Sequence, residues 1–153
     1  MHLQIIKKLF FFSLLFSMFF CLNANSQEKF LSLKKNKVNV RYGPGLDYEV
    51  KYIYKKINLP VKLIDKKENF RKIIDLKKNS GWIHWTLLKS SNSIIILEDK
   101  ILFKKPSNFS KPIARLEKGR LLVVKKCKKI WCSVKTENYT GWIKNENVWG
   151  NIK

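Results

Sequence analysis

Histidine and acidic residues are scarce in this sequence. It contains 2 histidines, His2 and His84, and 11 acidic residues against 32 basic ones. Catalytic triads, zinc sites and histidine-based acid–base pairs need a histidine near a nucleophile, an acid or a second ligand. No motif supplies such a partner for His84, which we interpret as an exposed residue at a strand end. The sequence therefore predicts a protein that is not an enzyme and has no metal or other cofactor.

Cysteine is equally rare. Of the 3 cysteines, Cys21 lies in the apolar N-terminal stretch, which leaves Cys127 and Cys132 as an even pair. Their spacing would place them on facing strands of a hairpin, where a disulfide is geometrically accessible. The alternatives are a metal half-site, which lacks further soft ligands, and a redox pair, which would require closer spacing. We expect a structural disulfide that contributes on the order of 2 kcal/mol.

Long apolar runs are missing except near the N-terminus. Lys7 and Lys8 precede an apolar run from Leu9 to Leu22, and Ala24-Asn25-Ser26 provides small residues after it. This is the arrangement of a secretory signal peptide. A membrane span needs roughly 20 apolar residues, so cleavage is favoured over a retained anchor. We expect a signal peptide at 1–26 and a periplasmic or secreted mature chain without a membrane span.

Positive charge dominates the composition. The formal net charge is +21, and only 4 of the 32 basic residues are arginine. Such an excess attracts anionic partners over long range. Nucleic-acid readers favour arginine, so we expect no nucleic-acid partner for an exported chain. Because lysine, asparagine and isoleucine share A/T-rich codons, the charge is also interpretable as compositional bias.

Short alternating or β-branched runs fill the rest of the chain, which is typical of an all-β protein. The first set of predicted strands covers 37–41, 59–65, 70–76 and 81–84, and the second covers 101–104, 121–126, 131–135 and 141–144. Each set has a long loop after its first strand, at 42–56 and 105–119. The matching order indicates an internal duplication.

Each set closes on the same tripeptide, Gly81-Trp82-Ile83 in the first and Gly141-Trp142-Ile143 in the second. A glycine inside a strand allows a bulge or a close backbone approach. The tryptophan that follows could then bury a large apolar area over the end of a barrel. We expect Trp82 and Trp142 to be core residues that hold each unit together, and not ligand contacts.

The order of these motifs resembles the bacterial SH3 family. Val38-Asn39-Val40-Arg41-Tyr42-Gly43-Pro44-Gly45 is similar to its opening signature, and Gly81-Trp82-Ile83-His84 with Leu87-Leu88 to its close. Cys127, Trp131-Cys132 and Val148-Trp149-Gly150 are similar to an exported, tandem branch. The resemblance implies two small, partly open five-stranded barrels, usually cell-wall or peptide-targeting modules without catalytic activity. Lys104-Lys105-Pro106 replaces Gly-Pro-Gly in the second unit, which puts binding through that loop in doubt.

The predicted organisation is therefore two tandem SH3-like barrels behind a signal peptide. We assign 27–90 to the first domain, 91–98 to an interdomain strand or linker, and 99–153 to the second domain. Pro44 and Gly45 are expected at the centre of a type II turn, with Gly45 at positive φ. The apolar run from Ser93 to Leu97 should pack the units together or, if exposed, recruit a partner's strand edge.

Candidate binding residues lie in the first unit, in its long loop and in the turn after its last main strand. They are Arg41, Tyr42, Tyr48 and Trp85, with Lys55 nearby. Aromatic rings flanked by cations suit extended peptides and the sugar or peptide stems of a cell wall, although the same rings could simply pack the loop. We expect an exported module that binds peptidoglycan or an envelope peptide or protein. A structural adaptor and an electrostatic binder of anionic envelope polymers are the alternatives.

Overall fold

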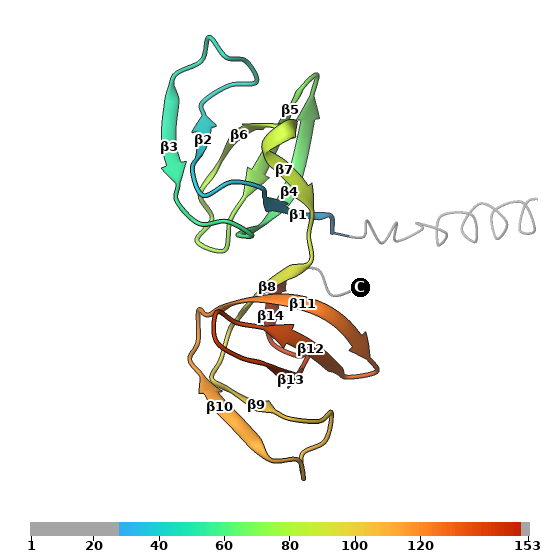
Figure 1. Ribbon diagram of the computed structural model, residues 1–153. Coiled ribbons are helices and arrows are strands. Elements are labelled where there is room, and N and C mark those ends of the chain that lie inside the picture. Colours follow the sequence, from blue (N-terminus) through green and yellow to red (C-terminus); the bar gives the residue numbers. More distant parts are fainter. Residues whose placement is uncertain (1–27, 151–153) are drawn as a thin grey trace, which may run out of the picture.

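The computed structural model describes residues 28–150, and the expected signal peptide lies outside them. Two β-sheets of seven strands each follow one another along the chain and stack end to end (Figure 1). In the described part of the chain, no helix is long and apolar enough to cross a membrane. The predicted all-β fold is confirmed.

The first sheet is antiparallel throughout, in the order β3-β2-β6-β5-β4-β1-β7. A single 3-10 turn, η1 (Trp85–Leu87), connects β6 to β7. The strands are β1 (Phe30–Leu33), β2 (Val38–Arg41), β3 (Val50–Tyr54), β4 (Pro60–Lys67), β5 (Phe70–Ile74), β6 (Ser80–His84) and β7 (Leu88–Ser90).

The second sheet repeats this topology strand for strand, in the order β10-β9-β13-β12-β11-β8-β14. Its strands are β8 (Ser93–Ile96), β9 (Lys100–Phe103), β10 (Pro112–Leu116), β11 (Leu121–Lys128), β12 (Trp131–Lys135), β13 (Thr140–Lys144) and β14 (Val148–Gly150). The predicted duplication is therefore present in the strand order as well as in the sequence. The run interpreted as an interdomain strand or linker contains β8, which lies inside the second sheet between β11 and β14.

Each unit has its own apolar core, built by residues that alternate along the strands. The first core contains Leu33, Val38, Val40, Val61, Ile73, Ile83 and Leu88. The second contains Ile94, Ile96, Leu102, Leu116, Leu122, Val124, Cys132, Val134 and Ile143. Val38 and Val40 illustrate the pattern, since Asn39 between them is only half-buried.

The prediction that Trp82 and Trp142 are core residues is wrong. On β6 and β13 the glycine and the isoleucine are buried, so the tryptophan between them points to the outer face and is half-buried. A lysine ammonium covers each ring, with Nζ of Lys72 6.0 Å from the Trp82 centroid and Nζ of Lys126 5.9 Å from the Trp142 centroid. The tryptophans stabilise the outer surface of the barrel through cation–π contacts.

The glycine prediction is confirmed. A Cβ on Gly81 would lie 2.5 Å from Cγ1 of Val40 and 3.0 Å from the carbonyl oxygen of Arg41. A Cβ on Gly141 would lie 2.7 Å from the carbonyl oxygen of Phe103. These two glycines let the β2 and β9 backbones approach the β6 and β13 backbones closely.

The two units meet at a compact junction. The buried Oγ atoms of Ser32 and Ser93 lie 2.6 Å apart, and Ser93 Oγ donates a hydrogen bond of 2.6 Å to the carbonyl of Asn58. The Phe30 and Trp149 rings meet edge to face at 5.1 Å, and Trp149 Nε1 donates to the carbonyl of Pro60 at 3.3 Å. Polar and aromatic contacts from both units therefore fix their relative position.

Candidate functional site

A groove of about 330 Å³ lies on the outer face of the first unit. Strand pairing explains its position, because Arg41 lies opposite Trp82 and Phe70 lies opposite His84, which puts alternate residues of β2, β5 and β6 on one face. We call this the first-unit groove, and it is lined by Lys37, Asn39, Arg41, Leu46, Phe70, His84 and Leu87.

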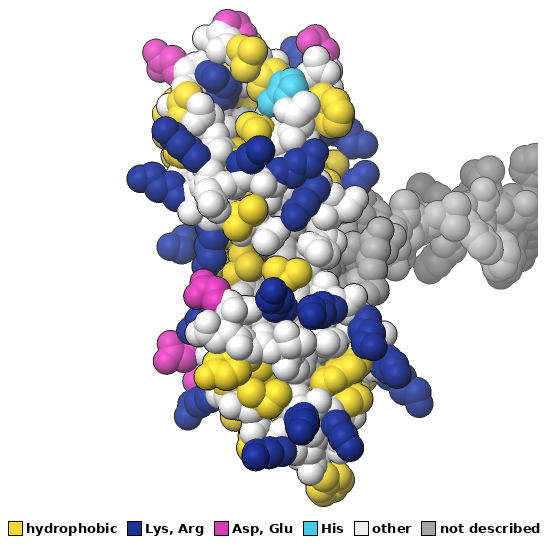
Figure 2. Space-filling view, viewed as in Figure 1, with side chains coloured by type: hydrophobic (Ala, Val, Ile, Leu, Met, Phe, Trp, Pro, Cys, Tyr) yellow, Lys and Arg dark blue, Asp and Glu magenta, His cyan; other side chains and the backbone are white. Residues whose placement is uncertain are grey.

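The groove has an apolar floor and an imidazole wall. Phe70 is only 6% exposed although it points away from the core, because His84 packs edge-on against its ring at 5.2 Å. His84 Nδ1 lies 2.7 Å from Oγ1 of Thr86, a hydrogen bond that fixes the imidazole. In Figure 2 the histidine lies beside hydrophobic side chains near the top of the first unit.

The Gly-Pro-Gly loop forms the upper edge of the groove, but its glycines do not have the predicted conformation. The glycines at positive φ within residues 28–150 are Gly119 and Gly150, so the expected type II turn with Gly45 at positive φ is wrong. Gly43 and Gly45 provide space instead: a Cβ on Gly43 would overlap the Tyr48 ring, and one on Gly45 would overlap the Asp47 carboxylate. Arg41 Nη1 donates a hydrogen bond of 2.6 Å to the carbonyl of Tyr48, which ties the loop to β2.

The predicted binding residues occupy different places around this groove. Arg41 lines it, and Trp85, 49% exposed, flanks it beside His84 with ring centroids 6.5 Å apart. Tyr48 packs over Gly43, and Tyr42, 63% exposed, lies under the Lys51 ammonium at 5.5 Å. Neither tyrosine lines the groove.

Sequence reasoning missed several lining residues. Asn39, Phe70 and His84 belong to strands that were predicted, and their period-two positions relative to the core valines and isoleucines would have placed them on the outer face. No strand periodicity could have identified Leu46, because its position depends on the path of the loop. Lys55 lies away from the groove, in a cleft between the two units.

The second unit fills the equivalent place differently. Phe103 lies opposite Trp142 as Arg41 lies opposite Trp82, and Lys144 lies opposite Trp131 as His84 lies opposite Phe70. Phe103 packs edge-on against Trp131 at 5.7 Å. The second unit therefore has an aromatic contact at the position where the first unit has the Arg41 guanidinium. The combination of groups that lines the groove is found in the first unit and not in the second.

The predicted disulfide is confirmed. Cys127 and Cys132 face each other across the β11–β12 hairpin with a Cα–Cα distance of 4.1 Å, which is typical of a non-hydrogen-bonded antiparallel pair. Lys66 and Arg71 form the equivalent pair in the first unit. Within residues 28–150 there is no group of three or more His, Cys, Asp or Glu side chains that could hold a metal ion.

The chain was compared with curated proteins and with solved structures. No curated protein matches the chain. Two solved structures from Trichomonas vaginalis, of NlpC2 and NlpC1, are each 12% identical to it with a TM-score of 0.38. The match covers 84% of this chain but 50% and 48% of theirs, so the chain spans about half the length of these proteins.

The family comparison is more specific. The sequence model of the bacterial SH3 domain matches residues 34–89 and again residues 99–150. Each match starts after the first strand of its sheet, β1 or β8, and runs into the last, and together the matches cover most of the chain. The chain therefore belongs to the bacterial SH3 domain family and carries two tandem copies of that domain.

Proposed function

We propose that this chain is an exported, non-enzymatic binding protein whose first-unit groove recognises a carboxylate-bearing peptide, such as the peptide stem of peptidoglycan or a peptide of an envelope protein. The observation that carries the proposal is the placement of the Arg41 guanidinium beside the buried Phe70 ring in one groove. A guanidinium binds a carboxylate through paired hydrogen bonds, and an apolar floor orients the adjoining side chain.

The remaining lining residues support an amphipathic ligand. Lys37 adds a second cation, and Asn39 and His84 offer polar atoms to a peptide backbone. Leu46 is 73% exposed at the groove's edge, where it has little to do for folding and is free to contact a ligand. A volume of about 330 Å³ suits a short segment and not a whole folded partner.

The family and the cysteine pair agree with this assignment. Bacterial SH3 domains are generally binding modules and often target cell walls, and the family is not catalytic. A structural disulfide is typical of proteins in oxidising compartments. Together with the N-terminal pattern of the sequence, these observations support an exported location.

The test is co-sedimentation of the purified protein with purified peptidoglycan at low and high salt. Retention should persist at high salt, because a specific groove depends less on long-range charge than a diffuse positive surface does. Leu46→Ala should weaken retention about fivefold by removing apolar contact with the ligand. Arg41→Gln should weaken it by at least as much, because it removes the guanidinium and also its hydrogen bond to the Tyr48 carbonyl in the loop that carries Leu46.

Ile130→Ala is the matched control, since Ile130 is a similarly exposed aliphatic residue on the second unit's hairpin turn. It should leave retention unchanged. Equal loss in the Leu46 and Ile130 variants would count against the groove, and loss of all binding as salt rises would indicate a charge effect. No retention at any salt would refute peptidoglycan as the ligand and favour a protein adaptor.

A further inference from the structure

A second and larger cleft, of about 780 Å³, opens between the two units. The first unit contributes Asn36 and residues 55–58, which lie near the ends of β1 and β3. The second contributes residues 117–120 after β10, Leu121 and Val123 of β11, and residues 135–137 at the end of β12. We call this the interunit cleft. It exists only because the units are held against each other.

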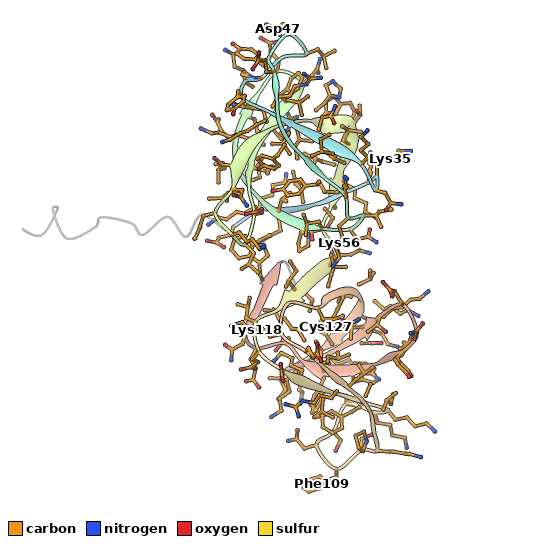
Figure 3. All side chains as sticks on the ribbon, turned by 90° about the vertical axis from the view of Figure 1, so that its left-hand side faces the viewer. Lys35, Asp47, Lys56, Phe109, Lys118 and Cys127 are labelled. Carbon is orange, nitrogen blue, oxygen red and sulfur yellow. A yellow bond between two sulfur atoms is a disulfide. The ribbon has the colours of Figure 1, made fainter. Side chains whose placement is uncertain are left out.

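Five cationic side chains from both units line the interunit cleft: Lys55, Lys56, Lys118, Arg120 and Lys135. All five are exposed, and none forms an ion pair with an acidic side chain of residues 28–150. Figure 3 labels Lys56 at the lower end of the first unit and Lys118 on the side of the second unit. Cations that converge on a concave surface focus the positive potential there more than the dispersed lysines of Figure 2 can.

The second-unit wall of the cleft is held in place before any ligand arrives. The backbone N–H of Gly119 donates to the carbonyl of Ile96 at 2.8 Å, and that of Lys118 donates to Asp99 Oδ1 at 2.9 Å. The Lys118 N–H and the Arg115 guanidinium lower the pKa of Asp99, which keeps its carboxylate ionised. The turn that carries Lys118 and Arg120 is therefore fixed to the sheet.

The first-unit wall is anchored in a similar way. The backbone N–H of Asn58 donates to the carbonyl of Leu33 at 3.0 Å, and the carbonyl of Asn58 accepts from Ser93 of the second unit. Tyr54, at the end of β3, donates its hydroxyl to Asp75 Oδ2 at 3.0 Å; burial raises the pKa of Tyr54, so the hydroxyl remains a donor. Because the backbone of both walls is ordered, the conformational entropy lost when an anion binds is mainly that of the exposed lysine and arginine side chains.

The lining distinguishes between classes of anion. Within the described chain no aromatic ring lines the cleft, so nucleobases have no stacking platform. Most of the lining comes from turns and strand ends, which offer no continuous edge for an added peptide strand. Glu117 and Glu137 would repel a closely spaced phosphate backbone, but they can accept hydrogen bonds from sugar hydroxyls.

We propose that the interunit cleft binds an acidic glycan, a polysaccharide whose sugars carry carboxylate groups. The five cations pair with the carboxylates, the two glutamates accept hydroxyl hydrogens, and both units take part in one site. This site is separate from the first-unit groove and does not depend on the groove's ligand.

The test measures binding of the purified protein to hexagalacturonate by isothermal titration calorimetry, at roughly 0.15 M salt to limit non-specific attraction. The triple variant Lys56→Gln, Lys118→Gln, Arg120→Gln should lose about tenfold in affinity, as expected for three exposed charge pairs. The matched control is Lys104→Gln, Lys105→Gln, Lys111→Gln, which removes the same charge from the exposed loop between β9 and β10. It should change the affinity less than about twofold.

Two further ligands complete the test. Neutral maltohexaose should bind much more weakly than hexagalacturonate, and linear polyphosphate should lose no more affinity in the cleft triple variant than in the control variant. Equal losses in the two triple variants, equal binding of maltohexaose, no binding of hexagalacturonate, or stronger cleft-dependent binding of polyphosphate would each overturn the proposal. Circular dichroism of every variant confirms that the fold is retained.

Discussion

Gly81 and Gly141 show how a single missing side chain determines a contact between two strands. In both units the glycine faces the core at the point where another strand's backbone lies closest, and a Cβ there would collide with backbone or branched side-chain atoms. Neither glycine has a positive φ. Its contribution is space, and its backbone conformation is open to any residue.

Replacing Gly141 with alanine should therefore destabilise the second unit. The new Cβ would lie 2.7 Å from the carbonyl oxygen of Phe103 and 2.8 Å from Cγ of Leu102, so β9 would have to move away from β13. We expect a loss of about 1–3 kcal/mol in the free energy of unfolding, the usual cost of overpacking. Urea unfolding followed by tryptophan fluorescence measures it.

Gly45→Ala is the control for this substitution. The atom nearest to its new Cβ is the carboxylate of Asp47, at the far end of an exposed side chain that can rotate away. Its cost should stay within about 0.5 kcal/mol, as for most surface changes. A Gly141→Ala protein as stable as the Gly45→Ala protein would show that the β9–β13 contact is softer than the structure indicates.

Local sequence reasoning was least reliable for residue orientation. The Gly-Trp-Ile motif correctly marked two strands, but the tryptophans were assigned to the core because of their size. Period-two alternation with Ile83 and Ile143 puts them on the outer face, so the alternation should have outweighed hydrophobicity. Gly45 was assigned a positive φ from the Pro-Gly pair alone. The structure gives another reason for a glycine at this position: the side chains of Asp47 and Tyr48 occupy the space that a Cβ would need.

The β11–β12 hairpin differs from its counterpart, β4–β5, by one covalent link. Cys127 and Cys132 occupy the cross-strand pair that Lys66 and Arg71 occupy in the first unit. A covalent link so close to the turn shortens the loop that must close during folding. The second unit therefore has a stabilising element that the first unit lacks.

Replacing both cysteines with serine should lower the stability of the second unit by about 2 kcal/mol, as the chain-entropy account gives for so short a loop. Thermal unfolding with and without dithiothreitol measures the effect. Reductant should destabilise the native protein to the same extent and should not alter the double variant. Mass spectrometry under non-reducing conditions should show a deficit of two hydrogens in the native protein, and free thiols at both positions would contradict the assignment.

Sequence patterns predicted the four central strands of each sheet well and the remaining strands poorly, including β1, which lies inside its sheet. β2 and β6 carry buried residues at alternate positions, and β4 and β5 carry buried apolar residues, so their signal is strong. β3 and β10 lie at the sheet edges with mostly exposed side chains, and both were taken for loop. Edge strands are specified by backbone pairing with a neighbour, which a single sequence does not display.

The first-unit groove was predictable only in part, because its lining also depends on strand pairing that a single sequence does not display. Arg41 and Trp85 were identified from their residue types and from the family resemblance. Phe70 lies within a predicted strand, but its orientation was not predicted. Its place on the outer face follows from the pairing of β5 with β6, and that of Leu46 from the fold of a loop.

For the whole molecule, the junction makes the two domains one body. β7 ends at Ser90 and β8 begins at Ser93, so only two residues connect the units, and Ser91 is buried against Ser32 with a hydrogen bond of 2.9 Å. Trp149 of β14 reaches across to Phe30 and Pro60. We expect such units to unfold together.

Trp149→Ala should uncouple the unfolding of the two units. Loss of the edge-to-face contact and of the indole hydrogen bond removes about 2 kcal/mol of contact between the units. Differential scanning calorimetry should show one transition for the native protein and two for the variant. Trp85→Ala, which changes an exposed tryptophan away from the junction, should keep a single transition. Two transitions in the native protein would contradict the rigid junction.

The pairing of Phe30 with Trp149 also brings the two ends of the described chain together at the waist of the molecule (Figure 1). The loop tips, marked by Asp47 and Phe109 in Figure 3, lie at opposite extremes. A tether, label or fused domain joined at either end would therefore sit at the middle, far from both tips. A molecule held from its centre would keep both loop tips exposed.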